Sequence, residues 1–537
     1  MADLNILANR IADWASKKPD LDVLTFVDID SEGHFIEEIR TYQQLWENGQ
    51  RLAAWLQSQG MQKGDSFALV MANHPEFVDL MVASSILGTI FVPVDPRTQG
   101  DKLKYMLDFA ECKGAVVADY ALANVDAVWA QRDDCWILPM GTEVDGSLES
   151  VLAGELPATP LLVSSQDPDE PMQMLYTSGT TGDPKAILAP HNRMATAEVI
   201  ADVLDLREDD RPYTGLSLTH ANAQLITLGV SLTMGLRAVI SRRFTKSRLW
   251  DIARHYNCTW FNLLGGMTTA LYAEPQRDND RENPVRIILS AGMPAEIWED
   301  FARRFDVKIY EFYGAAEGGL TFNPAGVGPI GSCGRAPAIL KLKILDDNDR
   351  ECSPGEMGEV CFQNSDGSAP VVRYFKNPEA SAKKTRSGWL RMGDVGHMDE
   401  EGWLYFHYRK GGGIRRNGDF VNAAFVEKVL SEINSVDDVF VYGVPIKNGA
   451  PGEKDVVAAI VPTDRSRFNA DKIFDQCRKH LERNFVPRYL HLLAEIPKTA
   501  SEKPQERFLL EAFDPAADFI IEDKPTRADE RSSMKPA

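Results

Sequence analysis

The segment with the clearest chemical potential is the run Tyr-Thr-Ser-Gly-Thr-Thr-Gly-Asp-Pro-Lys at residues 176–185. It holds four Ser/Thr hydroxyls, two glycines and a lysine, and it follows the short apolar run 171–176, which is typical of a strand. Backbone N–H groups and hydroxyls in such a loop can surround phosphate oxygens. The loop is not a Walker A sequence, because it contains no Gly-Lys dipeptide. A flexible linker would need neither the strand before it nor the Pro-Lys after it, so we expect a phosphate-binding loop.

Four further segments follow at increasing residue numbers. They are Ala-Gly-Met-Pro at 291–294, Tyr-Gly-Ala-Ala-Glu at 313–317, Gly-Trp-Leu-Arg-Met-Gly-Asp at 388–394 and Pro-Lys-Thr-Ala-Ser-Glu-Lys at 497–503. Together with the loop, these segments resemble the motifs of the acyl-adenylate-forming superfamily, which includes acyl-CoA synthetases, peptide-synthetase adenylation domains and luciferases. Several motifs in the family's order are far more specific than one loop.

Membership of this superfamily implies an ATP-dependent acid–thiol ligase. Such an enzyme adenylates a carboxylic acid, releases pyrophosphate and passes the acyl group to coenzyme A. No protein nucleophile is required, because positioning and charge neutralisation supply the catalysis. The expected cofactors and small-molecule partners are therefore ATP, Mg²⁺, a carboxylic acid and coenzyme A.

The resemblance also implies the roles of individual residues. Lys503 is expected to neutralise charge at the α-phosphate, Glu317 to hold Mg²⁺ and Tyr313 to stack on adenine. The expected catalytic residues are Lys503, Thr177, Glu317 and His220. The expected ATP-binding residues are Thr177, Ser178, Gly179, Thr180, Thr181, Gly182 and Lys185 in the loop, Gly292 and Met293 opposite the adenine, Tyr313 and Gly314, Asp394 and Arg409 at the ribose, and Lys503.

The sequence departs from the family motifs at two positions. Ala316 stands where the family usually has threonine, which removes a hydroxyl near the phosphates. Glu502 replaces a common glycine in the turn before Lys503.

The acyl pocket is expected around the segment Thr-His-Ala-Asn-Ala-Gln at 219–224, which resembles a branch that includes carnitine and crotonobetaine ligases. Very small residues would line the rest of the pocket, and their small volume favours a bulky acid that is polycyclic, steroid-like or branched. A carnitine- or crotonobetaine-like acid is the alternative, since the glycines could serve turns and leave the pocket ordinary. The expected pocket residues are His220, Asn222, Gly265, Gly266, Ala315 and Gly318.

The strands and helices that position these motifs are predicted from alternating patterns along the sequence. The runs 66–73, 114–119, 285–292 and 307–314 are typical of buried strands, and 294–305 has the apolar spacing of a helix. This alternation predicts an α/β fold whose large N-terminal domain contains parallel-sheet subdomains. Ligands in such folds gather at the carboxyl ends of the strands.

The pattern changes at residues 409–419, where four glycines and four basic residues interrupt any regular element. We expect an ATP- and carboxylate-binding domain at residues 1–410 and a small mobile α+β lid domain carrying the catalytic lysine at 411–537. By resemblance, Gly411 is the hinge and Gly418 lines the passage for coenzyme A.

Regular elements are also predicted within the lid domain. The expected helices are 421–433 and 470–485, the expected strands are 437–444 and 455–462, and residues 515–537 are expected to form a loosely held tail.

Composition excludes several classes of protein. The net charge of −21 argues against a nucleic-acid partner, and the scattered cysteines suggest neither a zinc site nor a disulfide framework. The N-terminus lacks a signal-peptide pattern. The uncharged stretch 212–236 is polar in its first half, which favours a site loop running into a buried helix over a membrane span. We expect a cytoplasmic protein without stable membrane insertion, and a homo-oligomer is compatible with the sequence.

Two other functions are compatible with the motifs. An adenylation enzyme could load a carrier protein instead of coenzyme A, although the chain carries no carrier-type serine motif of its own. A degenerate nucleotide-binding module is the second, but the presence of Lys503, Asp394 and Glu317 weighs against it.

Overall fold

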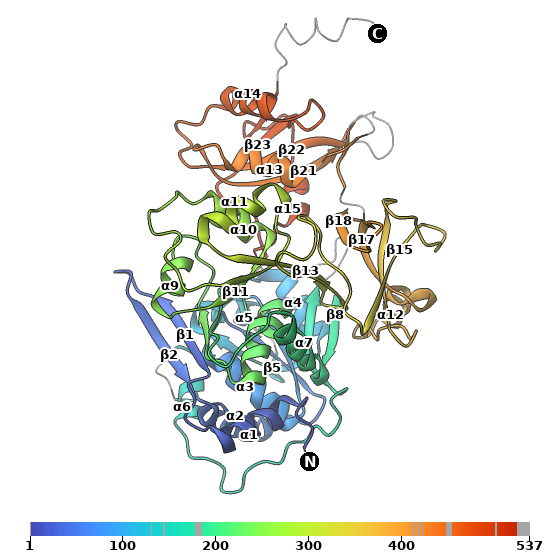
Figure 1. Cartoon of the computed structure of the whole chain (residues 1–537). Coiled ribbons are helices and arrows are strands. Elements are labelled where there is room, and N and C mark those ends of the chain that lie inside the picture. The colour runs from blue at the N-terminus through green and yellow to red at the C-terminus, as the bar shows by residue number, and fades with distance from the viewer. Residues whose placement is uncertain are drawn as a thin grey trace, which may run out of the picture.

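A large domain and a smaller C-terminal domain make up the chain in the computed structural model (Figure 1). The small domain covers the end of the large domain that lies opposite the N-terminus. The mixed α/β architecture and the small α+β domain agree with the predicted fold class. The structure describes residues 2–129, 132–142, 145–177, 185–410, 413–416, 419–421, 423–446, 454–499 and 502–523.

The first sheet of the large domain is parallel in its interior and antiparallel at both edges. The runs predicted as strands at 285–292 and 307–314 are its neighbouring strands β12 and β13. In order across the sheet, the strands are β14 (Gly318–Asn323), β13 (Lys308–Ala315), β12 (Ile287–Ala291), β11 (Trp260–Leu264), β9 (Pro212–Thr214), β10 (Ala238–Ser241), β1 (Leu24–Ile29) and β2 (Phe35–Arg40).

The second sheet is also parallel apart from one edge, where β7 and β8 form an antiparallel hairpin. The runs predicted as strands at 66–73, 114–119 and 171–176 are confirmed as β3, β5 and β7. In order, the strands are β6 (Trp136–Met140), β5 (Cys112–Ala118), β3 (Ser66–Val70), β4 (Ile90–Val94), β7 (Pro171–Thr177) and β8 (Lys185–Pro190).

Helices pack on both sheets and share one apolar core with them. Phe26 on β1, Phe91 on β4 and Phe301 on α11 belong to the same buried cluster, because parallel strands are apolar on both faces and need covering elements. The helices are α1 (Leu7–Lys17), α2 (Tyr42–Ser58), α3 (Pro75–Leu87), α4 (Gly100–Phe109), α5 (Asp119–Trp129), α6 (Leu148–Leu152), η1 (His191–Ala195), α7 (Thr196–Val203), α9 (Leu249–His255), α10 (Gly265–Ala273) and α11 (Ala295–Phe305).

The uncharged stretch 212–236 contains a loop that leads into a buried helix, as predicted, and it is no membrane span in the described structure. After β9, the chain forms the π-helix η2 (Ala223–Leu228) and continues as α8 (Gly229–Met234), whose residues up to Thr233 are buried. No helix in the described part of the chain has the length and apolar character needed to cross a membrane.

A third, antiparallel sheet lies beside the other two in the large domain (Figure 1). Its last two strands form a hairpin that places Asp394 opposite Arg409. Its strands are β15 (Leu340–Leu345), β16 (Gly358–Asn364), β17 (Leu390–Met398) and β18 (Leu404–Arg409), and α12 (Pro378–Lys384) and η3 (Arg386–Gly388) precede β17.

The small domain contains the predicted helices and strands with somewhat different ends. One expectation is wrong in part: residues 520–522 are not a loose tail but form β24, the edge strand that pairs with β23. The predicted helix 470–485 ends at residue 480, because Leu481 adopts an extended backbone and packs into the core. The elements are β19 (Arg415–Arg416), β20 (Asp419–Phe420), α13 (Ala423–Ser431), β21 (Val436–Pro445), β22 (Lys454–Pro462), α14 (Ala470–His480), β23 (Tyr489–Leu492), α15 (Glu506–Ala512) and β24 (Ile520–Glu522).

The connection between the two domains is short. On its N-terminal side, the Lys410 backbone N–H donates to Gly393 O at 2.8 Å and its ammonium lies 3.1 Å from Asp347. On its C-terminal side, Ile414 is buried in the core of the small domain. The chain is therefore anchored to one domain at residue 410 and to the other at residue 414.

Polar contacts join the facing surfaces of the two domains. The Lys246 ammonium in the large domain lies 3.1 Å from the Asp437 carboxylate in the small domain. Lys428 on α13 donates from its ammonium to the backbone carbonyl of Glu296, at the start of α11, at 3.3 Å. These contacts hold the small domain over the end of the large domain at which the predicted motifs meet.

Candidate active site

The predicted phosphate loop connects the two strands of an antiparallel hairpin. Thr177 is the last residue of β7 and Lys185 is the first of β8, and the two lie opposite each other. The Lys185 ammonium lies 5.5 Å from the centre of the Tyr374 ring. Residues 178–184 lie outside the described part of the chain, and they include the predicted ATP-binding residues Ser178, Gly179, Thr180, Thr181 and Gly182.

The predicted adenine wall is a turn directly after β12. Gly292 has a φ of +102°, a conformation that favours glycine. A Cβ atom at this position would also lie only 3.3 Å from the Gly265 Cα. The N–H groups of Gly292 and Met293 both donate to the buried carboxylate of Glu311. Because Tyr313 lies two residues further along β13, a single strand carries the support of the turn and the aromatic ring expected to face it.

Glu311 was not among the predicted site residues. Burial raises the pKa of its carboxyl to about 8, although the hydrogen bonds from Gly292 and Met293 act in the opposite direction. The sequence does contain a signal for this residue, because an acid within an otherwise apolar strand needs a buried partner.

Asp394 connects the adenine and ribose ends of the predicted nucleotide site. Its buried carboxylate accepts a hydrogen bond from the Tyr313 hydroxyl at 2.5 Å and another from the Arg409 guanidinium at 3.2 Å. A carboxylate has about four acceptor positions, so both oxygens can still accept hydrogen bonds from ribose hydroxyls. Three of the predicted nucleotide-binding residues therefore meet in one hydrogen-bonded cluster.

Glu317 lies in a second cluster, which contains several cations. Its Oε1 accepts a hydrogen bond from the Tyr374 hydroxyl at 2.8 Å and lies 3.8 Å from the Lys384 ammonium. The Arg193 guanidinium donates to the carbonyl of Ala316 at 2.5 Å and is attracted electrostatically by Glu317.

The residues around Glu317 fit a magnesium ion that arrives with a nucleotide. The Tyr374 hydroxyl and the Lys384 ammonium both contact Oε1 of the Glu317 carboxylate, so Oε2 can take a cation. Mg²⁺ typically binds one or two carboxylates together with water and phosphate oxygens. Within the described ranges, no group of three or more His, Cys, Asp or Glu side chains could hold a metal by itself.

The small domain contributes Lys503 to this region. Its side chain is accessible to solvent, yet it is surrounded by enough protein to lower its pKa. Burial is the largest cause, repulsion by Arg409 adds to it, and attraction by Asp394 and Glu317 opposes it. The same ammonium contributes to the lowered pKa of His220 in the large domain. Lys503 therefore lies within electrostatic range of Asp394, Glu317 and His220.

Glu502 keeps the turn for which the family uses glycine. Its φ is +57°, in the left-handed region, so the backbone adopts the glycine-type conformation despite the larger side chain. The turn is closed by hydrogen bonds from the Glu502 N–H to Thr499 O at 3.0 Å and from the Thr499 N–H to Lys503 O at 2.9 Å. Glu502 therefore holds a left-handed turn directly before Lys503, at a conformational cost of about 1–2 kcal/mol.

Comparison with protein families identifies the chain. The family described as "AMP-binding enzyme" matches residues 11–368, and the "AMP-binding enzyme C-terminal domain" matches residues 426–503. The chain belongs to the AMP-binding enzyme family. This confirms the superfamily predicted from the motifs.

Curated relatives of this AMP-binding enzyme include ligases. The "Crotonobetaine/carnitine--CoA ligase" of Escherichia coli O17:K52:H18 is 27% identical over 86% of this chain and 91% of its own length. The "Long-chain fatty acid transport protein 1" of Mus musculus is 29% identical over 88% of this chain and 78% of its own length.

Solved structures of similar fold include two CoA ligases. An anthranilate CoA ligase in complex with anthranoyl-AMP has a TM-score of 0.81 at 21% identity and covers 94% of this chain and 96% of its own. A benzoate CoA ligase from Burkholderia xenovorans LB400 has a TM-score of 0.78 at 21% identity, with coverages of 94% and 99%. At such identities these structures support the fold alone.

The region predicted as the acyl pocket of this AMP-binding enzyme has a polar wall. His220 Nδ1 accepts a hydrogen bond from the Asn222 N–H at 3.2 Å, and burial with repulsion by Lys503 lowers the pKa of His220 to about 4. The Asn222 side chain accepts from Asn262, which in turn accepts from Thr227 on η2 at 2.9 Å. His220 is therefore neutral at physiological pH, and a chain of neutral polar groups lies behind it.

The glycines predicted to widen the acyl pocket face protein atoms instead. A Cβ atom on Gly265 would lie 3.1 Å from Gly292 O, one on Gly266 would lie 3.5 Å from Glu502 O, and one on Gly318 would lie 3.3 Å from Leu390. Ala315 packs on the apolar cluster of the third sheet, and a Cβ atom on Gly314 would lie 2.8 Å from Gly319 O. Close approach of neighbouring segments therefore accounts for these small residues.

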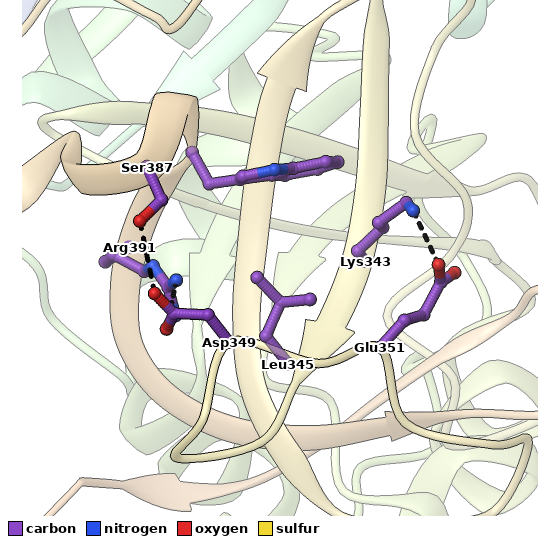
Figure 2. A pocket seen from close by; sticks show the side chains of 7 residues that line it. Lys343, Leu345, Asp349, Glu351, Ser387 and Arg391 are labelled. Carbon is purple, nitrogen blue, oxygen red and sulfur yellow. Dashed lines mark hydrogen bonds and ion pairs between the residues drawn. The ribbon is translucent and has the colours of Figure 1, made fainter.

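A hollow of about 350 Å³ lies outside the candidate site, on the third sheet (Figure 2). Its charges neutralise each other, since Arg391 lies 2.6 Å from Asp349 and Lys343 lies 2.5 Å from Glu351. Arg391 also lies 3.5 Å from Glu359, which accepts a hydrogen bond from the Gly393 N–H beside Asp394. We interpret this hollow as support for the turn at Gly393 and Asp394 and place no ligand in it.

Replacing Glu311 with glutamine should change how the stability of this AMP-binding enzyme depends on pH. A pKa raised from 4.5 to about 8 means that the folded state binds the proton more tightly than the unfolded state. The stabilisation is complete below pH 4.5 and is lost as the pH rises towards 8. Compared with Glu311→Gln, the wild type should therefore lose up to a few kcal/mol between pH 5 and pH 8. Denaturant titrations of both proteins at pH 5, 6.5 and 8 measure this difference, and parallel profiles would contradict the assignment.

Substitutions of Glu502 should separate the effect of its backbone conformation on the rate of acyl-adenylate formation from the effect of its charge. Glycine adopts a positive φ without strain, so Glu502→Gly should form acyl-adenylate within about threefold of the wild-type rate. Valine is β-branched and disfavours this conformation, so Glu502→Val should be clearly slower. Pyrophosphate release measures both rates, and Glu502→Ala controls for loss of the carboxylate. Equal rates for the glycine and valine variants would show that the conformation of this turn does not matter.

Proposed function

We propose that this protein is an AMP-forming acid–CoA ligase. The observation that carries the proposal is the position of Lys503, which the small domain brings within electrostatic reach of Asp394, Glu317 and His220 of the large domain. These four residues were predicted from separate motifs, and their association matches the needs of adenylate formation. Similarity to relatives that are named as CoA ligases supports the same reaction.

In the first half-reaction, the enzyme binds ATP between its two domains. Adenine lies between the Gly292 turn and the Tyr313 ring, and the ribose hydroxyls donate to Asp394. A carboxylate oxygen of the acid attacks the α-phosphorus, the bond to the bridging oxygen breaks, and pyrophosphate leaves. The Lys503 ammonium neutralises the charge that develops on the α-phosphate oxygens, where a preorganised cation is most effective.

Glu317 is the residue that would hold Mg²⁺. When bound, the metal neutralises phosphate charge and orients the leaving group. The Tyr374 hydroxyl fixes the Glu317 carboxylate through Oε1, so Oε2 is held in a defined direction before the nucleotide arrives.

In the second half-reaction, the thiol of coenzyme A attacks the acyl-adenylate carbonyl. A thioester forms, the bond to the AMP oxygen breaks, and the thiol proton is released to solvent. We propose that the small domain rotates about residues 411–413 between the two steps, because the chain is anchored at Lys410 on one side and at Ile414 on the other. Gly411 and Gly418, the predicted hinge and thiol-passage residues, lie outside the described residues.

The contacts around the acyl pocket favour an acid with hydrogen-bonding groups. The Asn222–Asn262–Thr227 chain presents neutral polar groups. In addition, Gln224 Oε1 is buried and, among the described residues, has no hydrogen-bond partner. The proposal of a bulky polycyclic, steroid-like or branched acid loses support, since Gly265, Gly266 and Gly318 face protein atoms. We therefore rank a polar, carnitine-like acid first and a bulky acid second.

A substrate screen tests the proposed function. The enzyme is incubated with Mg·ATP, coenzyme A and panels of betaine-like, fatty, aromatic and polycyclic acids, and pyrophosphate and acyl-CoA are both measured. Pyrophosphate and acyl-CoA should form in equal amounts with at least one class of acid. Absence of pyrophosphate with every acid contradicts the proposal. Transfer to a phosphopantetheinylated carrier protein but not to coenzyme A would establish the alternative acceptor.

Because ATP and coenzyme A are cytoplasmic metabolites, we propose a cytoplasmic location.

A further inference from the structure

Among the described residues, two largely buried cations share the Glu317 carboxylate at the predicted triphosphate position. The Lys384 ammonium lies 3.8 Å from Glu317, and the Arg193 guanidinium, which donates to the carbonyl of Ala316, is attracted electrostatically by the same carboxylate. The Lys384 and Glu317 side chains are only 14% and 9% exposed. Positive charge held out of water without an equal number of partners is costly, so this region is built to receive an anion.

We propose that Lys384 is a further ATP-binding residue, whose ammonium contacts the polyphosphate. This inference rests on the proposed function, and none of the sequence motifs includes Lys384. It lies at the end of α12, ten residues before Asp394, in a segment without any pattern that indicates a nucleotide site.

The hydrogen bonding of Lys384 leaves donors for a ligand. An ammonium has three N–H donors. In the part of the chain that the structure describes, the Lys384 ammonium donates a hydrogen bond to the backbone carbonyl of Met392 at 3.2 Å. The Glu317 carboxylate lies further away, at 3.8 Å, which is an ion-pair distance. The ammonium therefore lies between the carboxylate expected to meet the phosphates and the strand that carries Asp394.

The carboxylate with which Lys384 pairs indicates which part of the nucleotide the Lys384 ammonium contacts. Its nearest carboxylate is Glu317, whereas Asp394, at the ribose, is engaged by Tyr313 and Arg409. Removal of the ammonium should therefore weaken binding of ATP much more than binding of AMP.

Calorimetric titrations with ATP and AMP, with Mg²⁺ and in excess EDTA, test the inference. For Lys384→Met, the affinity for ATP in EDTA should fall about tenfold, while the affinity for AMP stays within about twofold, as expected for loss of one charge-assisted contact. Lys384→Arg should retain most of the affinity for ATP. Lys383→Met is the matched control, because Lys383 is the preceding residue on α12 and is exposed.

The outcomes separate this inference from the proposed function. Unchanged ATP affinity in Lys384→Met, or an equal loss for AMP and ATP, would overturn the role assigned to Lys384. A wild-type protein that binds no ATP would overturn the proposed function itself. If Lys384→Met does not fold, Lys384→Gln is titrated in its place, and the same two comparisons decide.

Discussion

Replacing Lys503 with alanine is expected to lower the rate of acyl-adenylate formation by about 10²–10³-fold, as found when one preorganised charge stabiliser is removed. Conversion of preformed acyl-adenylate to acyl-CoA should be nearly unaffected. The difference arises because the ammonium is needed only while charge accumulates at the α-phosphate. Its nearness to Glu317, Asp394 and His220 in this structure fits that step.

The two half-reactions must be measured separately to test this expectation. Single-turnover pyrophosphate release reports the first, and consumption of added acyl-adenylate with coenzyme A reports the second. Lys498→Ala is the control, because Lys498 lies in the same motif but pairs with Asp438 inside the small domain at 2.5 Å. Equal losses in both half-reactions would mean that Lys503 does not act specifically during adenylation.

The second large effect is expected for Gly411→Pro. Proline fixes φ near about −65° and would restrict the few bonds between the anchors at Lys410 and Ile414. Adenylate formation should remain nearly intact, because the small domain already covers the nucleotide site. Thioester formation should fall by at least about tenfold, since rotations of this kind often limit turnover.

Pyrophosphate and acyl-CoA formed in the same single turnover provide the measurement. Gly411→Ala is the matched variant, because alanine changes the same position without fixing φ. Wild-type amounts of both products in Gly411→Pro would show that rotation does not occur at residue 411. Loss of both products in the proline variant but not in the alanine variant would show that proline disturbs the first arrangement of the domains.

Local patterns in the sequence predicted the elements well. Strands β3, β5, β12 and β13 and helix α11 were expected within a few residues of their observed ends, because buried parallel strands are continuous apolar runs. The edge strand β24 was missed. Its three residues contain little pattern of their own, and they form a strand only because β23 offers a partner.

The candidate site was predictable where it depends on motifs and unpredictable where it depends on tertiary packing. Tyr313 and Asp394 were expected to bind different parts of the nucleotide, but their mutual hydrogen bond joins residues 81 positions apart. Glu311 and Lys384 lie outside the motifs, and only the folded chain brings them to Gly292 and Glu317.

The small residues around the acyl pocket show the same limit. Glycine at position 265 is compatible with empty space and with a close neighbour, and the sequence does not distinguish the two. In the structure, the backbone of Gly292 occupies the direction of its absent side chain. A prediction of substrate size from glycine content therefore needs the contacts of each glycine.

Under the proposed rotation of the small domain, the ion pair between Lys246 and Asp437 would make the balance between the two half-reactions sensitive to ionic strength. Its two side chains are 34% and 51% exposed, so dissolved salt can screen it, with a Debye length of about 8 Å at physiological concentrations. An exposed pair contributes about 0.2–1 kcal/mol, which corresponds to at most about a fivefold change in a conformational equilibrium. In dilute buffer, the small domain would remain longer in its adenylating position and delay the thiol step. In concentrated salt, it would leave that position sooner and make adenylation the slower step.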